Sequence, residues 1–307
     1  MVLLLGLLAC ASASGQQPRG ALGWSLGGEA HVFVASDRYA RDFYRELTTK
    51  GGLSDSLARR ALVTVEPRTP RIATVLSAYG AAPALLTLAR FHARGTCGYA
   101  GLVTELVLAF PPGGTPSGST PRSHTTVVAL LDEEPFTASA NAPRATLTRA
   151  RTRDLVNRVA QRAESLSRGP RAALVRQLTV DADQAADAGE VVPFGSRYAV
   201  GFRARYATAP GDTMLVTGIA STDIELRALH WVVRPQRLPL RGGMITGPRP
   251  ESAKRYSLRG AVPGAGGSTL LLVDEIADVS ARDSRATAVD VDTRRVIATQ
   301  PLALRCP

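Results

Sequence analysis

The second half of the chain alternates between short apolar stretches and turns that are too short to carry a crossover connection. Proline, glycine and aspartate gather in these turns, for example at 209–212, 262–267 and 292–294. A parallel pair of strands needs a connection of about a dozen residues or more, so the short turns predict antiparallel hairpins. The expected strands are 174–180, 197–208, 213–221, 224–233, 254–261, 268–276, 287–291 and 295–299.

The first half mixes strand patterns with helix patterns. Apolar residues at helical spacing predict helices at 37–48, 84–93 and 152–166, and Pro83 stands at the expected first turn of the second helix. Strands are expected at 31–35, 61–65, 72–77, 102–110 and 125–131. The sequence therefore predicts an α+β fold, with a helix-containing N-terminal half and an antiparallel β-rich C-terminal half.

The composition is that of a protein with a hydrophobic core. Apolar residues make up 45% of the chain and charged residues 21%, which excludes a disordered chain. The net charge is +11, and nearly all of the positive charge is arginine because Lys50 and Lys254 are the only lysines. Two interpretations stay open: an anionic partner, or the codon bias of a GC-rich genome.

The chain opens with a short apolar run followed by small residues. The run is far shorter than the roughly 20 residues that span a bilayer, and it is typical of a signal peptide. Leu7-Leu8-Ala9-Cys10 resembles the bacterial lipobox, in which the cysteine thiol receives a diacylglyceryl group. The resemblance implies lipidation at Cys10. Cleavage after Ala13 and an uncleaved N-terminal strand are the alternatives.

These features predict an order of segments and a location. Residues 1–10 form the signal peptide with its lipobox-like end and 11–20 a tether, followed by an α+β region at 21–168 and an antiparallel β region at 169–307. The two regions are either separate domains or one continuous domain. We expect a protein of the cell envelope that is anchored to the membrane surface by lipid and faces the periplasm; the alternative is a secreted or soluble periplasmic protein.

The cysteines and arginines provide further candidate residues. If Cys10 carries lipid, Cys97 and Cys306 remain as a pair, and export to an oxidising compartment favours a disulfide between them. Arg151, Arg158 and Arg162 flank the apolar face of the helix expected at 152–166 and form a candidate ridge for anionic envelope components. Nucleic acid is not expected as a partner, because no aromatic residue interleaves with these arginines. A solvated helix face is the alternative interpretation.

The sequence predicts no catalytic residue, metal or cofactor. Gly23-Trp24-Ser25-Leu26-Gly27 matches the G-x-S-x-G pattern of α/β-hydrolases, but that motif requires a strand before the serine and a helix after it. A turn ahead of the first strand is expected here instead. The four histidines lack metal-ligand spacing, and the glycine-rich stretch at 264–267 has no phosphate-loop lysine and is expected to be a turn.

Two hypotheses about function follow. The first is a non-enzymatic envelope protein that binds or scaffolds an envelope component. The second is an exported hydrolase with an acid/histidine site, which requires at least two such side chains within hydrogen-bonding distance in a concave site. The candidates for that site are Glu29, His31, His124, Asp132, Glu133, His230, Asp274 and Glu275.

Overall fold

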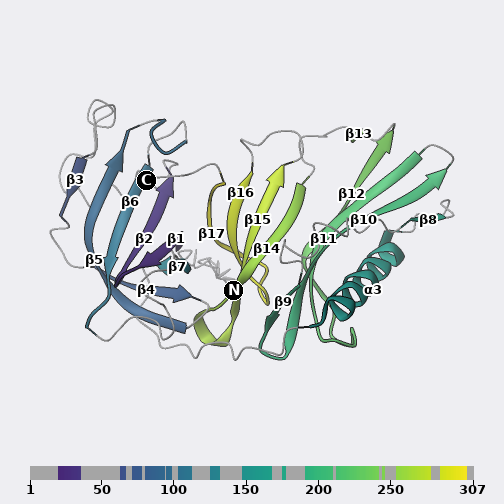
Figure 1. The fold of residues 1–307 in the computed structure, drawn as a ribbon, viewed down its shortest axis with the longest axis horizontal. Coiled ribbons are helices and arrows are strands. Elements are labelled where there is room, and N and C mark those ends of the chain that lie inside the picture. Colours follow the sequence, from purple (N-terminus) through teal and green to yellow (C-terminus); the bar gives the residue numbers. More distant parts are fainter. Residues whose placement is uncertain are drawn as a thin grey trace, which may run out of the picture.

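The computed structural model describes fourteen segments of the chain, and most of their residues lie in antiparallel strands (Figure 1). The expected α+β class is therefore wrong: within the described residues the only α-helix is α3 (Arg149–Ser167), and the rest of the regular structure is almost entirely strand. The described segments are 20–35, 63–66, 71–77, 80–93, 95–98, 103–112, 125–131, 147–167, 175–177, 191–209, 212–241, 244–245, 254–277 and 284–302.

A closed barrel of six strands forms the N-terminal part of the fold. Each strand pairs with its neighbours in the order β5–β4–β7–β1–β2–β6, and the pairing of β6 with β5 closes the ring. The short strand β3 (Val63–Val65) pairs with the C-terminal end of β5. The barrel strands are β1 (Gly20–Leu26), β2 (Glu29–Ala35), β4 (Ile72–Ser77), β5 (Gly80–His92), β6 (Val103–Ala109) and β7 (Thr125–Leu130).

Alternation along the barrel strands separates an interior face from an exterior face. One apolar cluster draws on all six strands and includes Val32, Phe91, Leu106 and Leu108, so it fills the interior. The residues between them, such as Glu105, therefore point outward. This alternation decides which side chains are available on the barrel surface.

A four-stranded sheet, here called sheet C, lies between the barrel and the rest of the protein (Figure 1). On β15, Leu270 and Leu272 pack against the barrel, whereas Leu271 and Val273 pack against the sheet on the opposite side. Both faces are buried, which explains the uninterrupted apolar run in this strand. Sheet C consists of β14 (Lys254–Pro263), β15 (Thr269–Ala277), β16 (Arg285–Asp290) and β17 (Val296–Pro301).

The remaining strands form sheet B, whose outer face is covered by α3. Leu155, Val156 and Val159 of the helix are buried against β10 and β11, which confirms the helix expected at 152–166. The strands are β8 (Val175–Gln177), β9 (Val191–Phe194), β10 (Arg197–Ala209), β11 (Asp212–Thr222), β12 (His230–Arg241) and β13 (Met244–Ile245).

The helix expected at 84–93 is wrong, because these residues belong to β5. The buried positions of β5 first follow the strand period of two, and the register then shifts between Leu86 and Leu88. The bulge interrupts the alternation of the strand, so the spacing of its apolar residues resembles that of a buried helix. Pro83 is tolerated because pairing with β6 begins only at Leu85, so its missing N–H faces no neighbouring strand.

Other boundaries also differ from expectation. The turn expected at 23–27 is wrong: β1 runs through Leu26, and a turn at Gly27 and Gly28 leads into β2 rather than into a helix. The strand expected at 224–233 begins only at His230. The turn expected at 264–267 is confirmed between β14 and β15, whereas the helix expected at 37–48 lies outside the described residues.

Across the described part of the chain, no helix combines the length and the apolar character that a membrane crossing requires.

Candidate functional site

A pocket of about 300 Å³ lies between the barrel and sheet C. Leu22, Leu76 and Val128 on the barrel pack against sheet C and hold the two bodies together, but this apolar contact leaves part of the interface unfilled. The barrel lines the pocket with Leu22, Gly23, Trp24, Phe33 and Thr126. Sheet C lines it with Arg259, Leu272, Val273, Asp274, Ala286, Thr287 and Gln300.

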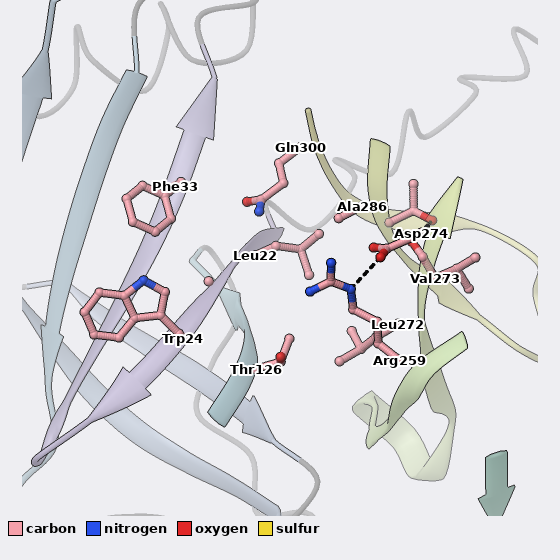
Figure 2. A pocket seen from close by; sticks show the side chains of 12 residues that line it. Leu22, Trp24, Phe33, Thr126, Arg259, Leu272, Val273, Asp274, Ala286 and Gln300 are labelled. Atoms are coloured by element: carbon pink, nitrogen blue, oxygen red, sulfur yellow. Dashed lines mark hydrogen bonds and ion pairs between the residues drawn. The ribbon is translucent and has the colours of Figure 1, made fainter. Parts of the chain in front are cut away.

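The two walls of the pocket differ in character (Figure 2). On the barrel side, Trp24 and Phe33 present aromatic rings. On the sheet C side, Arg259 and Asp274 face them, and Gln300 extends into the space between the walls. An apolar wall with a few placed polar groups is typical of sites for small organic ligands.

The polar wall contains a partly satisfied ion pair. Nε of Arg259 donates a hydrogen bond to Oδ2 of Asp274 over 2.7 Å, and the arginine side chain is 50% exposed whereas that of Asp274 is 12% exposed. Oδ1 of Asp274 and Oε1 of Gln300 are buried and have no hydrogen-bond partner among the described residues. Both oxygens are closed to solvent, so a ligand would reach them only if the surrounding side chains moved.

The aromatic wall is supported from behind by a histidine. The ring of Trp24 stacks on that of His31 with a centroid distance of 4.1 Å and an interplanar angle of 14°. This contact fixes the plane of the indole ring. Phe33 packs with Val103 and Cys97 in a small cluster that Trp24 also contacts.

His31 belongs to a polar cluster centred on Glu105, on the outer face of the barrel. The carboxylate receives three contacts: Nδ1 of His31 at 2.7 Å, Nε2 of His92 at 2.9 Å and a terminal nitrogen of Arg90 at 3.1 Å. Arg90 lies directly across from Glu105 in the β5–β6 ladder, and the two histidines lie diagonally on β2 and β5. Closure of the barrel thus assembles the cluster, which we call the Glu105 cluster.

The Glu105 cluster stabilises a buried charge. Burial alone raises the pKa of Glu105, but the hydrogen bonds from His31 and His92 together with the charge of Arg90 outweigh burial, so the pKa lies below its usual value. An ionised carboxylate only accepts hydrogen bonds, so each histidine must hold a proton on the nitrogen that faces Glu105. The arrangement is structural in character, because both carboxylate oxygens are already occupied.

The acid and histidine side chains expected from the sequence are only partly brought together. Nε2 of His31 lies 3.6 Å from Oε2 of Glu29, and neither residue lines the pocket. Asp274 lines the pocket but is paired with arginine, and Glu275 binds Lys254 at 2.6 Å. His230 is exposed at the start of β12, and His124, Asp132 and Glu133 lie outside the described residues.

Three residues of the Glu105 cluster are not predicted from the sequence: Arg90, His92 and Glu105. Arg90 and His92 fall in the segment that resembles a helix, and the separation of 74 positions between His31 and Glu105 hides their contact. The available signal was Glu105 itself, a single acid within an otherwise apolar strand. A buried carboxylate of this kind requires partners. Within the described segments, no group of three or more His, Cys, Asp or Glu side chains is placed to hold a metal ion.

The proposed arginine ridge is partly committed to internal contacts. Nε of Arg158 donates to Asp154 over 2.9 Å, and a terminal nitrogen of Arg158 donates to the carbonyl of Ile224 over 2.8 Å. Arg158 therefore connects α3 to the segment ahead of β12. Arg151 and Arg162 are exposed on the helix. Anion binding by these three residues stays a prediction.

The cysteines are described only in part. Cys97 is buried, with 1% of its surface exposed, near Phe33 and Val103. Cys10 and Cys306 lie outside the described residues, so lipidation and the Cys97–Cys306 disulfide stay predictions.

No family model, no curated protein and no solved structure matches this chain. The function proposed below therefore depends on the geometry of the pocket and of the Glu105 cluster.

Proposed function

We propose that the protein is a non-enzymatic binding protein of the bacterial cell envelope that holds a small organic ligand between its barrel and sheet C. The observation that carries the proposal is the pocket of about 300 Å³, which Trp24 and Phe33 line from the barrel and the Arg259–Asp274 ion pair lines from sheet C. Ligand sites commonly occur where two packed bodies meet. The lipobox-like segment at Cys10 supports the envelope part of the proposal.

The alternative, a hydrolase, has less support. Catalysis requires an acid or base that reaches a reacting atom in a concave site. Among the described residues, Asp274 is the only acid that lines the pocket, and its Oδ2 is bound by Arg259. His31 and Glu105 bind each other behind Trp24, where they position the indole ring.

Filling the pocket is expected to weaken ligand binding. The chain has two tryptophans, so the Trp231→Phe variant leaves Trp24 in the pocket wall as the only indole reporter. In that background, fluorescence titrations use neutral sugars, octanoate, octylamine and glycerol phosphate. We expect a saturable change with at least one class, and Thr126→Phe weakens it by about tenfold or more, equivalent to about 1.4 kcal/mol.

Thr64→Phe is the matched control, because Thr64 is exposed on β3 and does not line the pocket. Binding that the control retains and Thr126→Phe loses supports the proposal. If no probe class changes the Trp24 emission, or if Thr126→Phe binds as tightly as its control, the pocket is not the binding site.

The envelope part is tested separately by intact mass. The chain expressed from its own start in a bacterial envelope is expected to begin at Cys10 and to carry acyl mass. Cys97 and Cys306 should become alkylated only after reduction. An unlipidated chain that starts near Ser14 would leave a soluble exported protein, and an uncleaved chain with free thiols would contradict export.

A further inference from the structure

We infer that the ligand of the pocket is an amphiphilic carboxylate, that is, a small molecule with an apolar body and one carboxylate group that binds Arg259. The inference rests on the proposed binding function and specifies the chemical class of its ligand. It follows from the donors that Arg259 presents to the pocket, from the position of its negative partner and from the apolar lining around them.

Arg259 presents unused donors to the pocket. Its Nε donates to Oδ2 of Asp274 over 2.7 Å, which uses one of the five N–H donors of a guanidinium group. The terminal nitrogens point away from Asp274 into the space between the two walls (Figure 2). Among the described residues they make no hydrogen bond. The arginine side chain is 50% exposed, so a ligand can reach these donors without any rearrangement.

The negative partner of Arg259 is withdrawn from the pocket. The side chain of Asp274 is 12% exposed, its Oδ2 is bound by Arg259 and its Oδ1 is closed to solvent. The charged group that meets a ligand on this wall is therefore a positively charged donor. Such a group selects a ligand that carries acceptors, and a carboxylate matches the two terminal nitrogens of a guanidinium with two parallel hydrogen bonds.

The backbone aims Arg259 at the pocket. Leu258 pairs with Val273 and Gly260 with Leu272, so Arg259 is the extra residue of a β-bulge in β14. Bulges occur often beside functional sites, where they redirect a side chain away from the alternation of the strand. The bond to Asp274 on β15 then holds the guanidinium in place. Because the donors are oriented before a ligand arrives, binding costs less conformational entropy.

The charge of the site suits a ligand with a single negative charge. Among the described residues, the charged side chains that line the pocket are Arg259 and Asp274. A phosphate monoester carries a charge of about −1.5 to −2 at neutral pH and would find no second cation there to offset Asp274. A carboxylate carries one charge, and the net charge of +11 attracts anions to the protein.

The rest of the lining accommodates an apolar body. Trp24 and Phe33 present aromatic rings opposite Arg259, and stacking on His31 holds the indole plane (Figure 2). Burial of an apolar body against these rings provides affinity that an ion pair with a half-exposed arginine does not. The volume of about 300 Å³ is at the small end of ligand pockets, which suits one ring or a chain of medium length. The aliphatic residues of the lining are Leu22, Leu272, Val273 and Ala286.

The experiment compares ligands that share a body and differ in their polar end. The full chain carrying Trp231→Phe is titrated with octanoate, octan-1-ol, octylamine, benzoate, benzamide, glucose and inorganic phosphate, and the Trp24 emission is followed. We expect octanoate or benzoate to bind saturably and about tenfold more tightly than its neutral counterpart. Octylamine is expected to bind more weakly than octanoate, and glucose and phosphate are expected not to bind.

Substitutions at Arg259 test its role directly. Arg259→Gln removes the charge and is expected to weaken carboxylate binding about tenfold, with a smaller effect on octan-1-ol. Arg234→Gln is the matched control, because Arg234 is exposed on β12 and does not line the pocket. Arg259→Lys keeps a cation beside Asp274, which guards against a loss of folding. Because lysine lacks the planar fork, its carboxylate affinity is expected to lie between those of the wild type and Arg259→Gln.

The outcomes separate the ligand class from the binding function. If octan-1-ol and benzamide bind as tightly as the carboxylates, or if octylamine, glucose or phosphate binds and neither carboxylate does, the carboxylate inference is wrong while the binding function stands. Equal carboxylate affinity in the Arg259→Gln and Arg234→Gln variants would also overturn it. Should Arg259→Gln not fold, wild-type carboxylate affinity in Arg259→Lys would overturn it. No response to any probe would contradict both proposals.

Discussion

Replacing Glu105 by alanine is expected to destabilise the barrel by about 3–5 kcal/mol, because it removes the carboxylate that joins β2, β5 and β6 on the outer face of the barrel. The change leaves the buried imidazole of His92, the partly buried imidazole of His31 and a guanidinium without their acceptor. The side chain of Arg90 is 35% exposed and can turn toward water, so the lower part of this range is expected. Denaturant unfolding followed by Trp24 emission in the Trp231→Phe background measures the effect.

Glu29→Ala is the matched control for this variant. Glu29 approaches the same His31 at 3.6 Å, but its side chain is 52% exposed, so its loss is expected to cost about 1 kcal/mol or less. If the two alanine variants unfold at the same denaturant concentration, the Glu105 cluster does not stabilise the barrel.

The pH dependence of stability provides a second readout of the same residue. The pKa of Glu105 is lower in the folded chain than its usual value of 4.5, so its ionised form stabilises the fold above about pH 4.5. That contribution is lost as the pH falls from there toward the folded-state pKa. We expect the wild-type barrel to lose more stability between pH 6 and pH 3 than the Glu105→Ala variant. The difference between the two losses is the contribution of the Glu105 carboxyl group.

The sequence predicts the part of the fold where turns and strand periods agree. The hairpins of sheet C follow directly from apolar stretches separated by short turns, and β14, β15, β16 and β17 all lie close to the expected ranges. The barrel could not be predicted in this way. Its closure depends on the pairing of β5 with β6, and the bulge at Leu86 and Leu88 makes β5 resemble a helix.

The candidate site was even less accessible to sequence reasoning. Trp24 stands in a segment that reads as a turn, and its role becomes visible only when β1 packs next to sheet C. Asp274 was identified only as one member of an acidic pair, because nothing local distinguishes it from Glu275. The alternation along β15 separates them: Asp274 lines the pocket, and Glu275 binds Lys254 on β14.

Replacing Gly23 by alanine is expected to destabilise the protein by about 1–3 kcal/mol or more. Gly23 lies opposite Val32 in the β1–β2 ladder, and a Cβ atom there would stand 1.8 Å from the carbonyl oxygen of His31 and 2.7 Å from Cα of Val32. Because both obstacles are backbone atoms, the two strands must move apart. Gly23, the first glycine of the G-x-S-x-G pattern, thus allows two barrel strands to approach each other closely.

Gly260→Ala is the control for this prediction, because Gly260 also lies within a strand but a Cβ there meets no atom within 4 Å. It is expected to be neutral or to stabilise by up to about 1 kcal/mol, since alanine restricts the unfolded chain. Separation of β1 from β2 would also shift Trp24 and His31, which neighbour the affected atoms. Gly23→Ala should therefore lower both the unfolding midpoint and the affinity of the pocket. If Gly23→Ala and Gly260→Ala are equally stable, β1 and β2 are not closely apposed at this point.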